Sequence, residues 1–340
     1  MSSWPKMEPA TGAVERNTAG AVVAVEARMN YQAEAVQLVK SMRDADGNDV
    51  GLVGAEWAPI DVRMHNARLA AERPAVHTHG FEVLETGDPA AERGIDFKDT
   101  ADCTDRYYAE CEAVIKKALG GGCFVKAFDH NVRSSTGFAA KEALKGGGQV
   151  QQPASLVHGD YTANSAPRRL ELLGQPPKLN DALRPRLGDQ PLLSAGDVNG
   201  VLDGGGRRFM LINVWRNILP DPVESMPLAC CDARGVKAED LLTFEIHYAD
   251  RIGENYFARH RKRHDWYYFP DMARNEALLI KQWDSAGGLA RGHASDASNG
   301  APSTFALHSA FQDPSAPPDA RTRESIEVRC VVVFDEEKAE

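Results

Sequence analysis

Two residues that could bind one metal ion follow a short apolar run in the middle of the chain. His158 and Asp160 are separated by a single glycine and come after the apolar stretch 154–157, which favours a position at the end of a β-strand. Residues i and i+2 of a strand point to the same side, so the imidazole and the carboxylate can reach the same ion. A second histidine from a distant strand would complete a face of two histidines and one carboxylate, which leaves open positions on iron for a co-substrate and dioxygen.

A histidine that could play this part lies near the C-terminus. His308 ends the apolar run 305–307, and Arg323 and Ser325 follow on the next β-like segment. A histidine followed at moderate distance by Arg-x-Ser resembles the pattern of iron(II)/2-oxoglutarate oxygenases, in which the arginine and serine bind the far carboxylate of 2-oxoglutarate. The chemistry suits that role, because a guanidinium makes a paired, charge-assisted contact with a carboxylate and a hydroxyl adds a further donor.

The composition is that of a folded protein with an acidic surface. The chain has 340 residues, of which 43% are hydrophobic and 26% charged, values close to the average for globular proteins. This length fits two average domains or one elaborated all-β domain. The net charge of −10 repels phosphate backbones and argues against a nucleic-acid partner. The cysteines have no zinc or redox spacing, so we expect them to be reduced. We find no signal peptide and no apolar stretch that could span a bilayer, which predicts a cytoplasmic protein without membrane contact.

The first half of the chain predicts a mixture of helices and strands. The strands are expected at 21–29, 75–84 and 123–128, and helices at 31–41 and 104–119, the second ended by the glycines 120–122. The segments 133–152 and 173–206 are rich in glycine, proline and polar residues. We expect them to be long loops and candidates for a lid.

The second half predicts mainly short strands separated by turn residues. Such spacing is typical of a sandwich, jelly roll or barrel. The β-like runs are 209–215, 228–232, 242–248, 266–269, 277–283, 303–308 and 325–334.

Several blocks in the same order give the sequence a specific resemblance. From about residue 80 to 334 the chain resembles the hydroxylase/desaturase family of fungal and bacterial secondary metabolism. The blocks that carry this resemblance are Phe128–Arg133, Val157–Thr162, Ile212–Arg216, Pro227–Ala229, Cys231–Arg234, Trp266–Met272, Glu276–Leu279 and Arg323–Arg329.

The resemblance implies an α+β fold that is mainly β, with a double-stranded β-helix (a cupin-like jelly roll) over residues 153–335. An N-terminal α/β elaboration would occupy residues 21–152 and pack on this core, after a flexible tail over 1–20, with long loops between elements. The implied activity is that of a non-haem dioxygenase that uses iron(II), 2-oxoglutarate and dioxygen. It would hydroxylate or desaturate a small-molecule secondary metabolite while 2-oxoglutarate is decarboxylated to succinate.

The family motifs also imply roles for individual residues. His158, Asp160 and His308 carry over as iron ligands, and Arg323 and Ser325 as the 2-oxoglutarate clamp. Nearby alternatives for the clamp arginine are Arg321 and Arg329. Candidates for the substrate pocket or the surroundings of the metal are Tyr161, Asn213, Trp215 and Arg216. The sequence departs from the family pattern at Gly159, where a larger residue is expected, and at Ser309, where threonine is usual.

Other readings stay open at this point. His77 and His79 have the spacing to chelate a metal, although a half-exposed strand is the simpler interpretation. The basic run 259–263, with His260 and His264, is best interpreted as a solvated loop. A cupin-like hydrolase or isomerase without 2-oxoglutarate, or a non-catalytic partner subunit of a two-protein oxygenase, are the competing functions. The sequence leaves open whether the protein is a homodimer.

Overall fold

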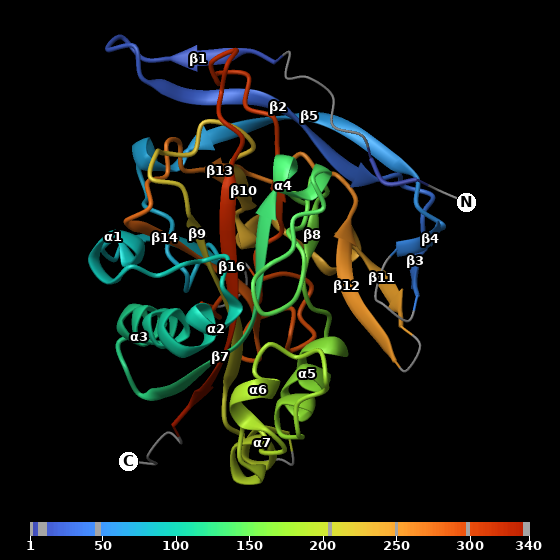
Figure 1. The fold of residues 1–340 in the computed structure, drawn as a ribbon. Helices are drawn as coiled ribbons and strands as arrows, with labels where there is room; N and C mark the ends of the chain where they lie inside the picture. Colours follow the sequence, from blue (N-terminus) through green and yellow to red (C-terminus); the bar gives the residue numbers. More distant parts are fainter. Residues whose placement is uncertain are drawn as a thin grey trace.

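The computed structural model describes residues 3–5, 12–44, 49–202, 206–248, 251–296 and 300–335. The fold is mainly β, as predicted, and consists of two sheets with helices on the outside (Figure 1). Strands that are neighbours in a sheet are mostly distant in sequence, and the chain crosses between the two sheets repeatedly. The protein therefore brings residues from both halves of the chain to one interior.

The larger sheet has eleven strands, and the strands that bear His158 and His308 lie near its middle. Its long strands β2 and β5 arch over one end of the molecule (Figure 1). In order across the sheet, the strands are β1 (Val14–Arg16), β2 (Val22–Gln32), β5 (Trp57–Asn66), β13 (Trp266–Tyr268), β10 (Leu228–Cys231), β15 (His308–Ala310), β8 (His158–Gly159), β12 (Ile252–Ala258), β11 (Leu241–His247), β3 (Leu38–Arg43) and β4 (Asp49–Val53).

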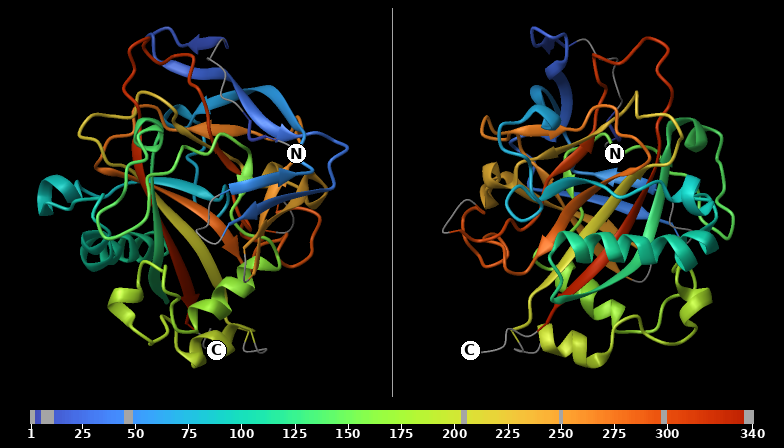
Figure 2. Two further views of the ribbon diagram at one scale, coloured as in Figure 1. Left: turned by 45° about the vertical axis from the view of Figure 1, so that its right-hand side comes forward. Right: turned by 90° about the vertical axis from the view of Figure 1, so that its left-hand side faces the viewer.

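The smaller sheet is buried on both faces. Every residue of its strands β9 and β14 is buried, which explains why these segments read as continuous apolar runs. Helix α3 packs across one face, and the other face turns toward the larger sheet (Figure 2). The strands, in order, are β6 (Phe81–Glu85), β14 (Glu276–Asp284), β9 (Phe209–Asn217), β16 (Glu324–Phe334) and β7 (Cys123–Ser134).

The helices are short except for α3, which has eleven residues. Helices α5, α6 and α7 gather at the end of the molecule opposite β2 (Figure 1). The α-helices are α1 (Pro89–Arg93), α2 (Thr100–Asp102), α3 (Tyr108–Ala118), α4 (Ser135–Ala139), α5 (Ser165–Leu173), α6 (Arg184–Leu187) and α7 (Ala195–Leu202). A π-helical turn, η2 (Cys103–Tyr107), precedes α3, and the 3-10 turns are η1 (Ala67–Leu69), η3 (Ala233–Gly235) and η4 (Ala238–Asp240).

Most predicted elements are present, and the differences have physical causes. The helix expected over 31–41 is wrong, because β2 continues to Gln32 and β3 pairs in parallel with β11. The strand expected over 75–84 begins only at Phe81, after a turn. The run 303–308 becomes a strand only from His308, and β12 was not predicted. The two stretches expected as loops, 133–152 and 173–206, contain helices α4, α6 and α7.

Both sheets draw strands from each side of residue 152, where we expected a domain boundary. Strands β6 and β7 of the smaller sheet come from the expected N-terminal elaboration, and β1 lies within the expected tail. The elaboration is thus interleaved with the core at the level of strand pairing. Among the described residues, no helix is long and apolar enough to cross a membrane.

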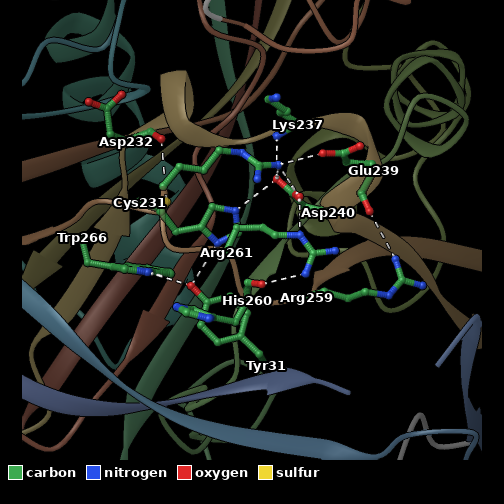
Figure 3. Close-up of polar contacts among 12 residues, drawn as sticks. Tyr31, Cys231, Asp232, Lys237, Glu239, Asp240, Arg259, His260, Arg261 and Trp266 are labelled. Carbon is green, nitrogen blue, oxygen red and sulfur yellow. Dashed lines mark hydrogen bonds and ion pairs between the residues drawn. The ribbon is translucent and has the colours of Figure 1, made fainter. Parts of the chain in front are cut away.

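The basic run 259–263 is anchored to the protein and is not a solvated loop, which corrects our interpretation. Figure 3 shows its surroundings, where the buried carboxylate of Asp240 is the common partner. Arg261 and Arg263 form ion pairs with it, and Nε2 of His264 lies 3.2 Å from it. The other ring nitrogen of His264 lies 3.2 Å from the hydroxyl of Tyr31, which ties β2 to this loop.

Candidate metal centre

Three side chains converge where β8 and β15 pair. His158 and His308 are directly opposite each other in this antiparallel pair, and Asp160 follows the end of β8. Their ligand atoms all lie within 4.8 Å of one another. The side chains of His158, Asp160 and His308 are 11%, 10% and 3% exposed to solvent. Among the described residues this is the single group of three or more metal-binding side chains at such distances.

Backbone contacts orient both imidazoles. Nδ1 of His158 lies 2.9 Å from the carbonyl oxygen of Leu156, and Nδ1 of His308 lies 3.2 Å from that of Ala306. A carbonyl can only accept a hydrogen bond, so each Nδ1 carries the proton and each Nε2 keeps its lone pair. The two Nε2 atoms lie 3.5 and 3.9 Å from Oδ1 of Asp160. This is the orientation that metal-binding histidines usually have.

The carboxylate of Asp160 is held from the smaller sheet. Asn213 on β9 donates a hydrogen bond to its Oδ2 at 3.0 Å, and Nε of Arg329 on β16 lies 3.8 Å from the same oxygen. The backbone N–H of Asp160 donates to Oε1 of Gln282 on β14 at 3.3 Å. Since Oδ2 is engaged by Asn213 and Arg329, Oδ1 is the oxygen that faces both histidines.

The electrostatics favour the protonation states that a metal requires. Burial and the neighbouring His308 lower the pKa of His158 to about 4, and burial also lowers the pKa of His308. Burial alone would raise the pKa of Asp160, but His308, Arg329 and Asn213 outweigh it and lower that pKa to about 2. At neutral pH the site therefore presents two neutral imidazoles and one carboxylate, which is the donor set of a non-haem iron(II) site.

The structure explains the departure at Gly159. A Cβ atom there would lie 3.0 Å from two ring carbons of Phe305. That ring is stacked with the rings of Tyr256 and Trp283, at centroid distances of 5.6 and 6.4 Å. A larger residue at position 159 would therefore collide with a packed aromatic ring. The hydroxyl of Ser309, the second departure, donates to the carbonyl oxygen of Ala310 at 2.9 Å and so is satisfied within β15.

Of the two residues of the predicted clamp, Arg323 lies just before β16 and Ser325 near its start, and both are buried with unsatisfied polar atoms. Nε of Arg323 and Oγ of Ser325 have no hydrogen-bond partner among the described residues. The guanidinium of Arg323 bonds through Nη1 to the carbonyl oxygen of Met226 and lies 5.4 Å from the ring centroid of Trp215. Burial and the nearby Arg133 lower the pKa of Arg323 to about 9, and Glu327 only partly offsets this. The protein thus supplies less negative charge than this guanidinium needs.

The alternative clamp arginines have partners elsewhere. Arg321 is half exposed and forms ion pairs with Asp221 and Glu224 at the surface. Arg329 pairs with Asp129 at 2.7 Å and lies close to Asp160. Sequence spacing could not show which of Arg321, Arg323 and Arg329 forms the clamp. Their partners in the fold do distinguish them, because Arg321 and Arg329 already have carboxylate partners.

The structure sorts the four residues proposed for the pocket or the metal surroundings. Asn213 contacts Asp160, and Trp215 packs beside Arg323, as already described. Tyr161 follows Asp160, is buried, and has its pKa raised by that burial. Arg216 points to the opposite face of β9, where its guanidinium bonds to Tyr107, Thr86 and Glu110. We therefore assign Arg216 to the packing of α3 on the smaller sheet and leave it out of the pocket.

The second histidine pair of the sequence has another role. His77 and His79 lie in a turn, not on a strand. Nη2 of Arg234 donates to Nε2 of His79 at 2.8 Å, and Nδ1 of His79 lies 2.9 Å from the hydroxyl of Thr78. Both ring nitrogens of His79 are thus engaged by protein groups.

Sequence reasoning missed two contacts to Asp160. Arg329 shares a strand face with Ser325, since the two are four residues apart on β16, and this parity could have indicated that it faces the interior. Gln282 gave no such signal, because the pairing register of β14 shifts between Lys281 and Trp283. A strand irregularity of this kind changes which face a side chain takes, and period-two patterns do not show it.

Comparisons with known proteins agree with this geometry. The family model described as "Oxidoreductase/YMDC permease-like domain" matches residues 27–188 and 192–333. The Fe(II)/2-oxoglutarate-dependent dioxygenase nvfI of Aspergillus novofumigatus is 30% identical over 283 residues, which cover 81% of this chain and 84% of that protein. The hydroxylase/desaturase poxK of Penicillium oxalicum is 27% identical over 252 residues, or 68% of this chain and 65% of that protein.

A solved structure shows the same relationship in three dimensions. The iron and alpha-ketoglutarate-dependent endoperoxidase NvfI aligns with a TM-score of 0.68 at 25% identity, over 93% of this chain and 99% of that one. The extent of the sequence and structural matches confirms the resemblance seen in the motifs, and the chain belongs to the hydroxylase/desaturase family of secondary metabolism.

Proposed function

We propose that the protein is a non-haem iron(II)/2-oxoglutarate-dependent dioxygenase that hydroxylates or desaturates a small secondary metabolite. One observation carries the proposal. Two Nε2 atoms and a carboxylate oxygen converge within 4.8 Å. Two buried donors without partners among the described residues, Nε of Arg323 and Oγ of Ser325, lie just before and at the start of β16, the strand whose Arg329 contacts Asp160. The first group fits a metal ion and the second fits a buried anion.

In this proposal His158, Asp160 and His308 hold iron(II). The bound metal with 2-oxoglutarate and dioxygen supplies the oxidising chemistry, in which the co-substrate is decarboxylated to succinate and a C–H bond of the substrate is oxidised. The protein's own residues set the geometry. The carbonyls of Leu156 and Ala306 fix the histidine tautomers, and Asn213 and Arg329 fix the carboxylate.

The dicarboxylate would be held at its far end by Arg323 and Ser325. A carboxylate there would satisfy both orphaned donors and neutralise a guanidinium that has no carboxylate within ion-pairing distance among the described residues. Burying such a charge without an anion is costly, and an anionic ligand removes that cost. The indole ring of Trp215, whose centroid lies 5.4 Å from the guanidinium carbon of Arg323, would form an apolar wall beside the bound dicarboxylate.

The remaining expectations fit this proposal. We infer that the two sheets form the double-stranded β-helix implied by the resemblance, with the metal between them. The hydrolase or isomerase without 2-oxoglutarate is disfavoured, because such an enzyme has no use for a buried dicarboxylate clamp. A non-catalytic partner subunit is disfavoured by the intact ligand set, and the names of the relatives support neither alternative.

Anaerobic titration of the protein with iron(II) and 2-oxoglutarate tests the proposal. We expect the weak visible charge-transfer band of the iron–2-oxoglutarate chelate to appear in the wild type and to be absent in His158→Ala. The matched control is His79→Ala, which removes a buried histidine outside the site and should keep the band. Absence of the band in the wild type, or its persistence in His158→Ala, would show that the proposal is wrong.

A further inference from the structure

Gln282 places a hydrogen-bond donor beside the proposed metal, and none of the described residues accepts a hydrogen bond from it. We propose that its side-chain N–H2 group recognises an uncharged oxygen of the substrate, and that the substrate is an apolar molecule bound on the far side of the metal from the 2-oxoglutarate clamp. This inference rests on the proposed function and adds the substrate class and the residue that selects it.

A β-bulge directs Gln282 toward the interior. On β14, Lys281 pairs with Ile212 of β9 and Trp283 pairs with Leu211, so Gln282 is an extra residue with no partner on β9. Bulges of this kind re-aim a side chain and are over-represented next to active sites. Here the bulge brings Gln282 against Asp160, at the end of β8.

The orientation of the carboxamide follows from its contacts. Gln282 is fully buried, and its Oε1 accepts the backbone N–H of Asp160 at 3.3 Å. Because that N–H can only donate, the oxygen must face it and the nitrogen must point away. Nε2 has no hydrogen-bond partner among the described residues. An unsatisfied buried amide donor destabilises the folded protein, and an acceptor on a bound ligand would remove this cost.

Strand register places Gln282 on the side of the metal away from the clamp. Ser325 pairs with Asn217 of β9, whereas Arg329 and Ile280 both pair with Asn213, the residue that holds Asp160. Ser325 therefore lies four residues, or about 13 Å, from the level of the metal. Gln282 lies beyond that level in the other direction, since β14 continues from Ile280 toward the partner of Leu211. The two sets of orphaned donors bracket the metal, and one co-substrate cannot satisfy both.

The residues around Gln282 define the chemistry of the ligand. Leu211 of β9 and Val331 of β16 pair with each other two residues beyond Asn213 and Arg329, so they lie on the same face of the sheet as those residues, next to Gln282 in the strand register. Both side chains are buried and apolar, so this end of the interior offers apolar surface and one neutral donor. A molecule with an acceptor oxygen such as a carbonyl, and without an ionised group, fits this environment.

A pair of probes of similar shape tests the inference. Acetophenone and ethylbenzene differ in one carbonyl oxygen, and their binding to the full chain can be measured by paramagnetic broadening of their proton signals. The protein is loaded with manganese(II) as an inert stand-in for iron, and with 2-oxoglutarate. We expect both probes to be broadened in the wild type, with acetophenone bound more tightly.

Two substitutions remove the donor in different ways. Gln282→Met removes the whole carboxamide, whereas Gln282→Glu keeps an oxygen for the N–H of Asp160 and replaces the N–H2 group with a second carboxylate oxygen, which when ionised can only accept a hydrogen bond. Loss of one neutral hydrogen bond should weaken acetophenone binding about threefold to tenfold in both variants, while ethylbenzene binding changes less than twofold. The matched control is Gln32→Met, because Gln32 is also buried, accepts a backbone N–H and has an unpartnered Nε2, but contacts Glu56 and not the metal site.

Each other outcome overturns the inference. If the substitutions weaken binding of both probes equally, Gln282 is only structural. If binding of neither probe weakens, its nitrogen does not contact the ligand. If the affinity for 2-oxoglutarate falls instead, the donor binds the co-substrate. Acetophenone that is not broadened in the wild type excludes the proposed substrate class. Failure of the proposed function is distinguishable, because it would abolish the iron–2-oxoglutarate band in the wild type, which the Gln282 inference does not affect.

Discussion

Two of the buried clusters in the described part of the chain, one around Asp160 and one around Asp240, combine histidine with aspartate but differ in how completely their polar atoms are satisfied. Around Asp240, hydrogen bonds come from the backbone N–H of Lys237 and from Arg263, and the ring of His264 contacts both this carboxylate and the hydroxyl of Tyr31. Around Asp160, the histidine Nε2 atoms lie 3.5 and 3.9 Å from the carboxylate, and they have no closer partner among the described residues.

The difference separates a structural cluster from a binding site. A buried network in which protein groups satisfy the charge stabilises a unique packing. A buried cluster whose lone pairs and donors have no protein partner lowers the stability of the fold unless a bound ligand pairs with them. Sequence spacing alone could not tell the two apart, because both contain a histidine close to acidic residues. The predictions below test whether this distinction holds.

The largest effect is expected at the clamp. Arg323→Ala should weaken 2-oxoglutarate binding about a hundredfold or more, since removing one partner of a buried charge pair costs about 2–5 kcal/mol. Anaerobic titration of the chelate band measures this affinity. Arg321→Ala is the control and should change it less than twofold, because Arg321 pairs with Glu224 and Asp221 at the surface. An unchanged affinity in Arg323→Ala would move the clamp to another residue.

The second effect is the contribution of His158 in the metal centre to the pH dependence of stability. The fold lowers the pKa of His158 from 6.5 to about 4, so the unfolded chain binds this proton first as the pH falls. The metal-free protein therefore loses stability between pH 6.5 and 4, by up to about 3 kcal/mol from this residue. Above pH 6.5 His158 is neutral in both states and contributes no slope.

Urea unfolding of the metal-free wild type and of His158→Asn at several pH values measures this contribution. The variant should lose less stability than the wild type between pH 6.5 and 4, because it lacks the titrating group. Other buried histidines remain in both proteins, so the difference between the two curves isolates His158. Parallel curves would contradict the prediction.

The third effect belongs to the satisfied cluster. His264→Ala should lower the free energy of unfolding by about 2 kcal/mol, because it removes a buried hydrogen bond to a charged carboxylate. It should leave iron(II) affinity unchanged, whereas His158→Ala should abolish iron binding. Urea unfolding and iron titration of both variants make the comparison directly. A tenfold loss of iron affinity in His264→Ala would show that the two clusters are not independent.

These tests also mark where sequence reasoning reached its limit. Local features were predictable: the two-residue spacing of His158 and Asp160, the helix ended by three glycines, and most strands of the second half. The contact between β8 and β15 joins residues 150 positions apart, and no local pattern specifies such a pairing. It was inferred only because family motifs linked His308 to His158.

Other features depended on tertiary context in ways that a single sequence does not record. The residues 31–41 have helical spacing, but Tyr31 is held in β2 by Trp266, whose Nε1 donates to its hydroxyl at 2.8 Å, and packing overrides local propensity. Arg216 and Asn213 alternate on one strand, and only the position of Asp160 shows which of them faces the metal. Gln282 could not have been found, because its direction depends on a bulge.

The smallest effect concerns the glycine between the two ligands on β8. In Gly159→Ala, the new Cβ atom would lie 3.0 Å from the ring of Phe305, which Tyr256 and Trp283 hold in place. We expect a loss of about 1–2 kcal/mol in unfolding free energy from this overpacking. Gly253→Ala on the neighbouring strand β12 is the control, because its Cβ would meet Tyr248 at an ordinary 3.5 Å.

Combining Gly159→Ala with Phe305→Leu shows whether the collision is the cause. The smaller side chain should remove much of the cost of the alanine, so the two changes together should destabilise the protein less than the sum of their separate effects. Strict additivity in urea unfolding would contradict this explanation. If the collision is real, Gly159→Ala should also weaken iron(II) binding, because His158 and Asp160 flank position 159 and any shift of β8 moves both ligands at once. The satisfied cluster around Asp240 should not be affected by Gly159→Ala, since β8 contributes no residue to it.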